Sequence, residues 1–524
     1  MIRYLAKLFN ALAKRQRSPV KQSSVTKLDS GLTHNLKHIM DELGNGSDVV
    51  NRQFLIGRSA PVLAGVIFID GLVDQEMIND NILQPLLRIE LERPVDLDVL
   101  EKSFLAVGGL KRVETMETLL EGVLTGDTAL LIDGQPSALL LSTKKWEQRG
   151  ISEPDTEVIV KGARDGFTET LRTNTALLRR RIEHPALRFD TMKIGKKTRT
   201  EICVAYIQGV AEDKLVEEVK KRLRRIDTAG ILSTESIDQF IDDAPFSPFA
   251  TVGYTERPDV CAAKLMEGRV AIIVDGTPVV HTVPFLFWES FQSPDDYNFR
   301  LFYANTMRWI RYLAFFTSVL LPGVYVALSS YHQELIPTNL LISMAAATEG
   351  TPFSAVVEAL GMGVVFEILR EAGIRLPRPV GQAVSIVGAL VIGEATVIAG
   401  LVGAPVVIVV ALTAIASFLV PSQVESAAFL RVVFTCLAGV FGALGIINGL
   451  IFVYIHLASL RSFGVPFLAP VAPIVPADLK DVAVRVPIWM MWTRPKSIDS
   501  PDRIRQAMRI RPEVPEEGHD DDRS

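Results

Sequence analysis

The chain is poor in cysteine, and its cysteines form no recognisable pattern. Cys203, Cys261 and Cys436 are the only three among 524 residues, they lack the spacing of metal ligands, and the last lies in an apolar run. Neither a disulfide framework nor a zinc site is indicated. We therefore expect the polar part of the chain to face a reducing compartment.

Sequence signatures of catalysis are also missing. The chain contains no GxxxxGK, HExxH or GxSxG motif, and no GxGxxG motif after a predicted strand. Asp70, Asp133 and Asp275 are each followed directly by a glycine at a predicted turn, where aspartate is favoured for structural reasons. The sequence predicts a protein that is not an enzyme, with no catalytic residue, no cofactor site and no metal site.

An excess of basic charge is absent as well. The chain has 55 basic and 60 acidic residues, a net charge of −5, which argues against a nucleic-acid partner. Residues 1–44 begin with seven bases before the first acid, Asp29, and fit either an amphipathic helix on anionic lipid or a solvated tail. Residues 463–524 are expected to form a cytoplasmic tail with an acidic end.

Apolar residues are abundant and concentrated in one part of the chain. They make up 48% of the sequence, and the mean hydropathy is +0.26. Residues 312–460 contain only eleven Asp, Glu, Lys or Arg residues, whereas residues 1–300 have an ordinary soluble α/β composition. The sequence predicts a soluble module followed by an all-α polytopic membrane domain at 301–462.

The soluble part contains an internal repeat. Six residues recur at a single offset, and an upstream apolar run recurs four residues short of that offset, so the region predicts two copies of one α/β unit, 45–185 and 186–300. The six residues are Gly126, Ala129, Asp133, Gly134, Pro136 and Trp146, which match Gly268, Ala271, Asp275, Gly276, Pro278 and Trp288. The upstream runs are Val66–Val73 and Val204–Ala211.

Each copy has the pattern of a strand, a turn and a charged helix, followed by a hairpin. The helices are predicted at 74–88 and 212–225, and the Asp-Gly pairs at 133–134 and 275–276 predict type I′ turns. A polar helix is predicted at 156–182. Its basic end, Arg179-Arg180-Arg181, could suggest phosphate binding, but a solvated helix C-terminus is the preferred interpretation.

Three apolar stretches predict four membrane spans, which would place both ends of the membrane domain on one side. Arg308, Arg311 and Arg461 then mark that side as cytoplasmic by the positive-inside rule. The stretch 333–379 is interpreted as re-entrant or interior to the bundle; if it crosses, there are five spans. The soluble module is cytoplasmic in both cases. The apolar stretches are 312–331, 380–423 (two spans joined at Gly403-Ala404-Pro405) and 432–460.

Ionisable residues inside the apolar part are the candidate functional residues, because burying one unpaired charge there costs on the order of 3 kcal/mol or more. Glu394 is the first candidate, since copies of it around an oligomer axis would form a carboxylate ring that favours cations. It could instead be protonated or paired with a base of another copy. The further candidates for a pore or an intramembrane polar role are Glu358, Glu367 and Asn448.

Some of these positions have structural alternatives. Glu367 can pair with Arg370, three residues later on a helix. The small residues Gly442, Gly445 and Gly449 surround Asn448 at helical spacing, which indicates close helix packing.

Several motifs together resemble the GerA family of bacterial spore-germination proteins, over about residues 45–475. The membrane part carries HQELIP at 332–337, EGTPF at 349–353, FEILREAG at 366–373, RLPRPVGQ at 375–382 and HLASLRSFGVP at 456–466. The soluble part carries DGLVD at 70–74 and PFLFW at 284–288.

The resemblance implies the A subunit of a nutrient germinant receptor. In that family the subunit is thought to form a homo-oligomer, a pentamer, that acts as a nutrient-gated cation channel in the spore inner membrane and triggers germination. The implied partners are a transporter-like B subunit that binds the nutrient, a lipoprotein C subunit, and membrane lipid. No motif identifies the nutrient.

Other interpretations remain open at the level of sequence. A germination-amplifying channel paralogue of the SpoVAF type would share the architecture, and a non-channel sensor or scaffold subunit would share the motifs. A ligand site between the two α/β copies is a further alternative. A secondary transporter would need symmetry-related broken helices, for which the membrane part has no internal match.

Overall fold

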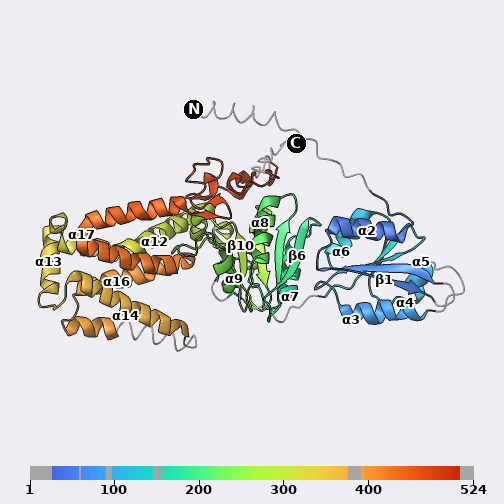
Figure 1. Ribbon diagram of the computed structural model, residues 1–524, viewed down its shortest axis with the longest axis horizontal. Coiled ribbons are helices and arrows are strands. Elements are labelled where there is room, and N and C mark those ends of the chain that lie inside the picture. Colours follow the sequence, from blue (N-terminus) through green and yellow to red (C-terminus); the bar gives the residue numbers. More distant parts are fainter. Residues whose placement is uncertain are drawn as a thin grey trace, which may run out of the picture. The chain divides into compact units, whose positions relative to one another are not determined.

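The computed structural model divides into two compact units (Figure 1). The first unit runs to Trp146 and includes Glu183–Pro185, and the second unit holds the remainder. The structure describes residues 26–57, 61–89, 97–145, 153–154, 157, 159–375 and 391–507. The predicted amphipathic segment before residue 26, Trp146 of the repeat, and the acidic end after residue 507 lie outside the described residues.

The first unit is a five-stranded antiparallel sheet with helices on both faces. Helices α2 and α6 cover one face, and α3 to α5 with the π-helical turn η1 cover the other (Figure 1). The sheet order is β1-β2-β4-β5-β3. The strands are β1 (Val49–Ile56), β2 (Val62–Ile69), β3 (Leu110–Val113), β4 (Thr128–Ile132) and β5 (Ala138–Leu141), and the helices are α2 (Leu32–Leu43), α3 (Gln75–Met77), η1 (Ile78–Leu83), α4 (Gln84–Arg88), α5 (Leu97–Ser103) and α6 (Met116–Leu124).

The second unit begins with a sheet of the same strand order, β6-β7-β9-β10-β8. Helices α7 and α10 pack on one face of this sheet and α8 and α9 on the other. The matching order is what two copies of one folding unit require. The strands are β6 (Leu187–Ile194), β7 (Thr200–Ile207), β8 (Gly253–Thr255), β9 (Val270–Val274) and β10 (Val280–Val283), and the helices are α7 (Leu171–Arg181), α8 (Asp213–Arg224), α9 (Thr234–Ile241) and α10 (Pro258–Met266).

Each sheet also has an equivalent side-chain cap at the start of its first helix. The carboxylate of Asp133 accepts a hydrogen bond of 3.0 Å from the N–H of Leu32, the first residue of α2. The carboxylate of Asp275 accepts a bond of 3.0 Å from the N–H of Leu171, the first residue of α7. These aspartates therefore satisfy the free N–H groups of a helix start.

The structure places the start of each α/β unit earlier than the boundaries predicted at residues 45 and 186. Helix α2 lies before residue 45 and packs on the first sheet, and α7 lies before residue 186 and packs on the second. Each copy therefore starts with a helix that the sequence analysis assigned to the preceding segment. The offset of this helix is 139, which differs from the two offsets found in the sequence because loops of different length follow it.

Three local predictions in the repeat were wrong. Among the hairpin residues, Gly134 and Gly276 have positive φ angles (84° and 92°), but the preceding aspartates do not, so the turns are not type I′. Arg179 is fully buried and lies over the ring of Phe189 at 4.9 Å, so the basic end of α7 is not simply solvated. The helix itself starts at Leu171 rather than near 156.

The helical part follows the second sheet in the same unit. By length and composition, two apolar stretches could cross a membrane: Leu301–Ser330, and Pro421–Ser459, which contains η4 and α17. Two shorter apolar helices, α13 and α16, accompany them. The elements are η2 (Phe287–Phe291), α11 (Asp295–Asn298), α12 (Leu301–Ser330), η3 (Gln333–Leu335), α13 (Thr338–Thr348), α14 (Ala355–Arg375), a helix at 391–398, α16 (Ala404–Ser417), η4 (Pro421–Gln423) and α17 (Val424–Ser459).

Helix α17 is two antiparallel helices joined at Gly442, where φ is 58° and ψ is −140°. Ser426 donates to the carbonyl of Pro248, and His456 bonds to Ser247, so both ends of α17 reach the same loop. The single span predicted at 432–460 was therefore wrong. The sequence gives no polar signal at the fold-back, which depends on one glycine in a conformation that is costly for other residues.

The remaining helices alternate in direction along this hairpin. Tyr331, at the end of α12, donates to the carbonyl of Gly439 near the fold-back. Val356, at the start of α14, packs against the same glycine, and the later residue Glu367 reaches Arg431. Helix α14 therefore runs antiparallel to both α12 and the first half of α17.

The segment after α17 is folded rather than a free tail. Its elements are β11 (Arg461–Ser462), β12 (Val465–Pro466), η5 (Leu479–Asp481), η6 (Ile488–Met490) and η7 (Lys496–Ile498). Ser462 accepts from the N–H of Phe285 at 2.9 Å, and Ser500 donates to the carbonyl of Val210 at 2.6 Å. The prediction of a tail from residue 463 is thus wrong up to residue 507.

The fold-back predicts an asymmetry between two glycine substitutions. Gly442→Ala should lower the free energy of unfolding by about 1–3 kcal/mol, because a side chain disfavours this φ/ψ region and its Cβ would lie 3.1 Å from Tyr331. Gly361→Ala, in open space on α14, should have no effect or stabilise slightly. Thermal unfolding of the purified protein checks both, and equal melting temperatures for the two variants would contradict the fold-back.

Candidate functional site

Glu358 is buried inside the helical part, with 3% of its surface exposed. Its Oε2 atom accepts a hydrogen bond of 3.1 Å from the N–H of Gly403, the residue before the first turn of α16. A helix N-terminus attracts an anion through its free N–H groups and its dipole. The Glu358 carboxylate is therefore used to hold α14 against the start of α16.

Glu367 lies between two arginines. It pairs with Arg370 at 2.6 Å on its own helix and with Arg431 of α17 at 3.2 Å. Arg431 is 7% exposed and also donates to the carbonyl of Ser318 on α12 at 2.9 Å. This cluster joins three helices and has one positive charge in excess. The sequence analysis did not anticipate the pairing of Glu367 with Arg431, because the two residues are 64 positions apart.

Of the three candidate glutamates, Glu358, Glu367 and Glu394, only Glu394 is exposed. It lies on the helix 391–398, is exposed to the surroundings of the chain, and makes no ion pair or side-chain hydrogen bond within the described ranges. Its neighbour Gly393 lies against Val407, with 3.5 Å from an ideal Cβ to the valine side chain. Glu394 is thus level with the first turn of α16, as is the carboxylate of Glu358.

The remaining intramembrane candidates differ in burial. Asn448 is exposed on the second half of α17, whereas Gly445 and Gly449 are buried. A Cβ at Gly449 would lie 2.7 Å from Phe434, and one at Gly445 would meet the carbonyl of Leu437. These glycines let the two halves of α17 approach closely, and Gly442 forms the turn between them.

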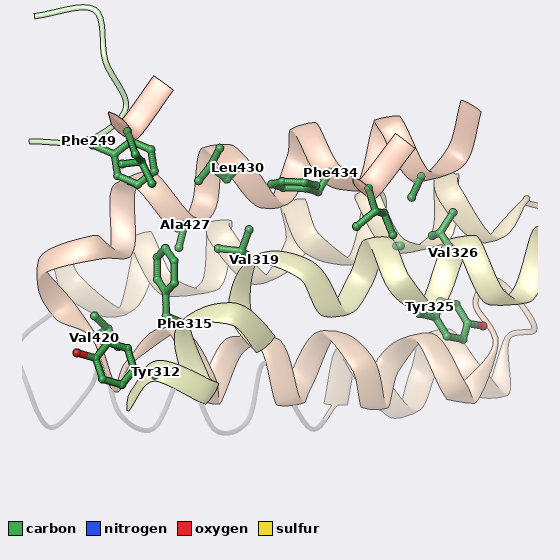
Figure 2. Packing of buried hydrophobic residues seen from close by; sticks show 14 of the residues in the cluster. Phe249, Tyr312, Phe315, Val319, Tyr325, Val326, Val420, Ala427, Leu430 and Phe434 are labelled. Carbon is green, nitrogen blue, oxygen red and sulfur yellow. The ribbon is translucent and has the colours of Figure 1, made fainter. Parts of the chain in front are cut away.

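An aromatic cluster connects the second sheet to the helical part. Phe249 and Phe315 lie on opposite sides of Ala427, and Tyr312 lies one turn earlier on α12 (Figure 2). The rings of Phe291 and Tyr312 are 4.5 Å apart. Pairs of this kind contribute about 0.5–1.5 kcal/mol each beyond the burial of their area. The cluster makes the base of α12 and the loop before β8 one packed body.

An ionic cluster fixes the start of α12 beside these rings. Asp296 is 1% exposed and accepts hydrogen bonds from Arg308 at 3.1 Å and from Arg311 at 3.0 Å. Arg308 is fully buried and also donates to Asp481 at 2.9 Å. The sequence analysis used Arg308 and Arg311 as charges facing the cytoplasm. In the structure both arginines form ion pairs inside the protein.

Burial raises the pKa of Asp481 above its ordinary value, although Arg308 and the hydroxyl of Tyr297 both oppose this shift. The hydroxyl of Tyr297 donates to Asp481 at 2.6 Å. Burial and the charge of Asp481 likewise raise the pKa of Tyr297, so its proton stays on the ring oxygen and can be donated. Asp481, in the segment after α17, thus joins Asp296 in pairing with Arg308 of α12.

No cluster of three or more His, Cys, Asp or Glu side chains suited to a metal ion occurs in the part of the chain that the structure describes. The ionic groups that do cluster contain arginines, which repel cations.

The ionic cluster predicts a large effect for one conservative substitution. Asp296→Asn should destabilise the protein by about 3 kcal/mol or more, because it leaves buried guanidinium groups partly uncompensated. Asp227→Asn is the matched control, since the Asp227–Lys196 pair is also close, at 2.6 Å, but both of its side chains are more than two-thirds exposed. It should cost no more than about 1 kcal/mol. Chemical or thermal unfolding checks the pair, and similar losses would contradict the role of Asp296.

Comparison with known proteins agrees with the motifs. The model of the Bacillus/Clostridium GerA spore germination protein family matches residues 37–497. Spore germination protein KA of Bacillus subtilis (strain 168) is 46% identical over 490 residues, which cover 93% of this chain and 90% of the relative. Stage V sporulation protein AF of the same organism is 31% identical over 444 residues, which cover 84% of this chain and 89% of the relative.

A solved structure is similar to part of the chain. The N-terminal domain of the A subunit of the Bacillus megaterium spore germinant receptor GerK3 is 36% identical, with a TM-score of 0.41, and the match covers 50% of this chain and 98% of that domain. The family match itself extends over both sheets and the helical part. The chain therefore belongs to the GerA family of spore germination proteins, and its role lies in spore germination.

Proposed function

We propose that this chain is the A subunit of a nutrient germinant receptor and that several copies form a nutrient-gated cation channel in the spore inner membrane. The similarity to Spore germination protein KA supports the receptor role. One observation carries the channel: Glu394 is a carboxylate on the outside of an apolar helical part, without a partner in the described ranges. Since an isolated charge there is costly, it fits a water-filled path.

The path runs between copies rather than through one helical bundle. Inside the bundle, Glu358 is bonded to Gly403, and Glu367 faces two arginines. The excess positive charge of the second group opposes the entry of cations. A ring of Glu394 side chains around an oligomer axis would attract them. Glu358, a pore candidate in the sequence analysis, therefore lies outside the proposed ion path.

The helices cross the membrane six times in this proposal. They are α12, α14, the apolar segment predicted to span from residue 380, of which the structure describes the helix 391–398, α16, and the two halves of α17, with α13 at the far end of the bundle. The alternating directions of α12, α14 and α17 support this count. An even number of passes keeps the second sheet and the folded segment after α17 on one side, which we take to be the cytoplasm.

Gating requires a partner that binds the nutrient. A transporter-like B subunit and a lipoprotein C subunit, implied by the family resemblance, would supply it, and the channel itself is proposed to be a pentamer. Nutrient binding can open the channel only by favouring the open state through differential affinity. The ionic and aromatic clusters at the base of α12 are the contacts through which such a change would reach the helices.

A paralogue of the SpoVAF type is the alternative function. Stage V sporulation protein AF is 31% identical to this chain, compared with 46% for Spore germination protein KA, and the difference favours the receptor subunit. A sensor or scaffold without channel activity would keep the family membership but would conduct no ions.

Replacing Glu394 by Gln tests the channel. The neutral amide removes the carboxylate ring and should lower the cation conductance or the cation-over-anion selectivity of the assembled protein, while the oligomer remains intact. Single-channel recording in planar bilayers measures both quantities, with the nutrient-binding partner present.

Glu371→Gln is the matched control, because Glu371 is also an exposed glutamate on a helix of this part but pairs with Arg375 at 2.6 Å. It should leave conductance and selectivity unchanged. Wild-type currents in the Glu394 variant would remove this residue from the path, and currents absent from every assembled complex would favour the scaffold alternative.

A further inference from the structure

One corner of the second sheet carries a dense group of exposed bases. The backbone of the turn between β6 and β7 is bonded to the segment after α8, from Lys196 N–H to Thr228 and from Lys197 N–H to Ala229, at 3.0 and 2.8 Å. This brings two basic stretches together. The basic corner consists of Lys193, Lys196, Lys197, Arg199, Lys221, Arg224 and Arg225, all of them exposed.

Acids next to this corner only partly balance it. Lys196 pairs with Asp227 at 2.6 Å, Lys221 pairs with Glu218 at 3.3 Å, and Glu201 lies across the strand pair from Lys193. Seven bases beside three acids leave a local excess of positive charge. A helix C-terminus favours cations, which accounts for the bases of α8 but not for those of the turn.

The repeat shows that the fold does not require this charge. The equivalent turn of the first unit, between β1 and β2, has the sequence Gly57-Arg58-Ser59-Ala60-Pro61, with one base. The two sheets have the same strand order, so the difference belongs to the second copy alone. Arg199 also has a φ of 49°, an uncommon conformation for a residue with a side chain. An anionic occupant would explain the excess of bases in the second copy.

The position of the corner argues against the lipid beside the helices. In the strand register, Ile194 pairs with Thr200 at the corner, while Leu187 pairs with Ile207 at the opposite end of the strands. That opposite end also holds Val283 of β10, which leads into the aromatic cluster at the base of α12. Eight residues of strand separate the two ends, about 26 Å.

We propose that the acidic segment 513–522 of the same chain docks on the basic corner. This segment has six acids and no Lys or Arg. The described end of the chain lies on the same unit as the corner: Ser500 bonds to Val210 just before α8, and Arg505 lies 3.8 Å from Glu267. The corner lies at the other end of α8, whose 12 residues span about 18 Å.

The length of the intervening chain is sufficient. Residues 513–522 are 6 to 15 positions beyond Ala507, the last described residue. An extended chain of that length reaches roughly 20–50 Å. The contact is electrostatic between exposed groups, so it weakens as salt rises. It would cover the basic corner with a part of the protein whose charge has no other assigned role.

Zero-length carbodiimide crosslinking of the purified full chain tests the proposal. The reagent joins a carboxylate to a lysine amine in contact, so mass spectrometry should find links from residues 513–522 to Lys196 or Lys197 at low salt. These links should fall to background in about 0.5 M salt. They should also vanish when the six acids are replaced by amides, while the Lys196–Asp227 link of the native ion pair persists as an internal control.

The matched variants are Lys196→Gln/Lys197→Gln and the control Lys37→Gln/Lys111→Gln, which removes two exposed lysines of the first unit. The first variant should lose the links from 513–522 to the corner, and the control should keep them. Links spread over Lys37 and Lys111 as often as over the corner would overturn the proposal. Links found only between isotopically distinct copies would also overturn it, since the docking would then not be within one chain.

Discussion

A carboxylate among apolar helices needs a donor, and this constraint organises the helical part. Glu358 is bonded to the N–H of Gly403, Glu367 to two arginines, and Asp296 to the arginines that start α12. The bonds of Glu358 to Gly403 and of Glu367 to Arg431 join elements that are distant in sequence, so these two acids help determine which helices pack together. Among the acids that the sequence analysis singled out, Glu394 is the exception, because it is exposed and unpaired within the described ranges. The proposed ion path depends on that contrast.

The sequence predicted the features that rest on local pattern or on self-similarity. Gly126, Asp133 and their counterparts revealed the repeat, and a shortage of charge revealed the helical part. It could not reveal pairings across long separations, such as Glu367 with Arg431. The fold-back at Gly442 was also missed, because hydropathy is the same whether an apolar helix continues or reverses. The backbone angles at that glycine and the contacts between the two halves of the helix distinguish the two cases.

The two clusters at the base of α12 give the soluble and helical parts of the second unit a common core. Phe249 belongs to the loop before β8, Phe291 and Asp296 belong to the link to α12, and Asp481 belongs to the segment after α17. A movement of the second sheet therefore has to move the start of α12 or break buried ion pairs. Packed cores and buried pairs favour discrete arrangements over gradual deformation, which suits a switch between two states.

Thiol modification at position 394 tests the proposed path most directly. In a Cys436→Ser background, Glu394→Cys should react with a charged, water-soluble thiol reagent, and the current through the open complex should change at once. Burial raises the pKa of Cys261 to about 12, so this native thiol should stay unreactive. Met362→Cys, placed inside the bundle, is the control and should give no change. A current that ignores modification at 394, or responds equally at 362, would contradict a path between copies.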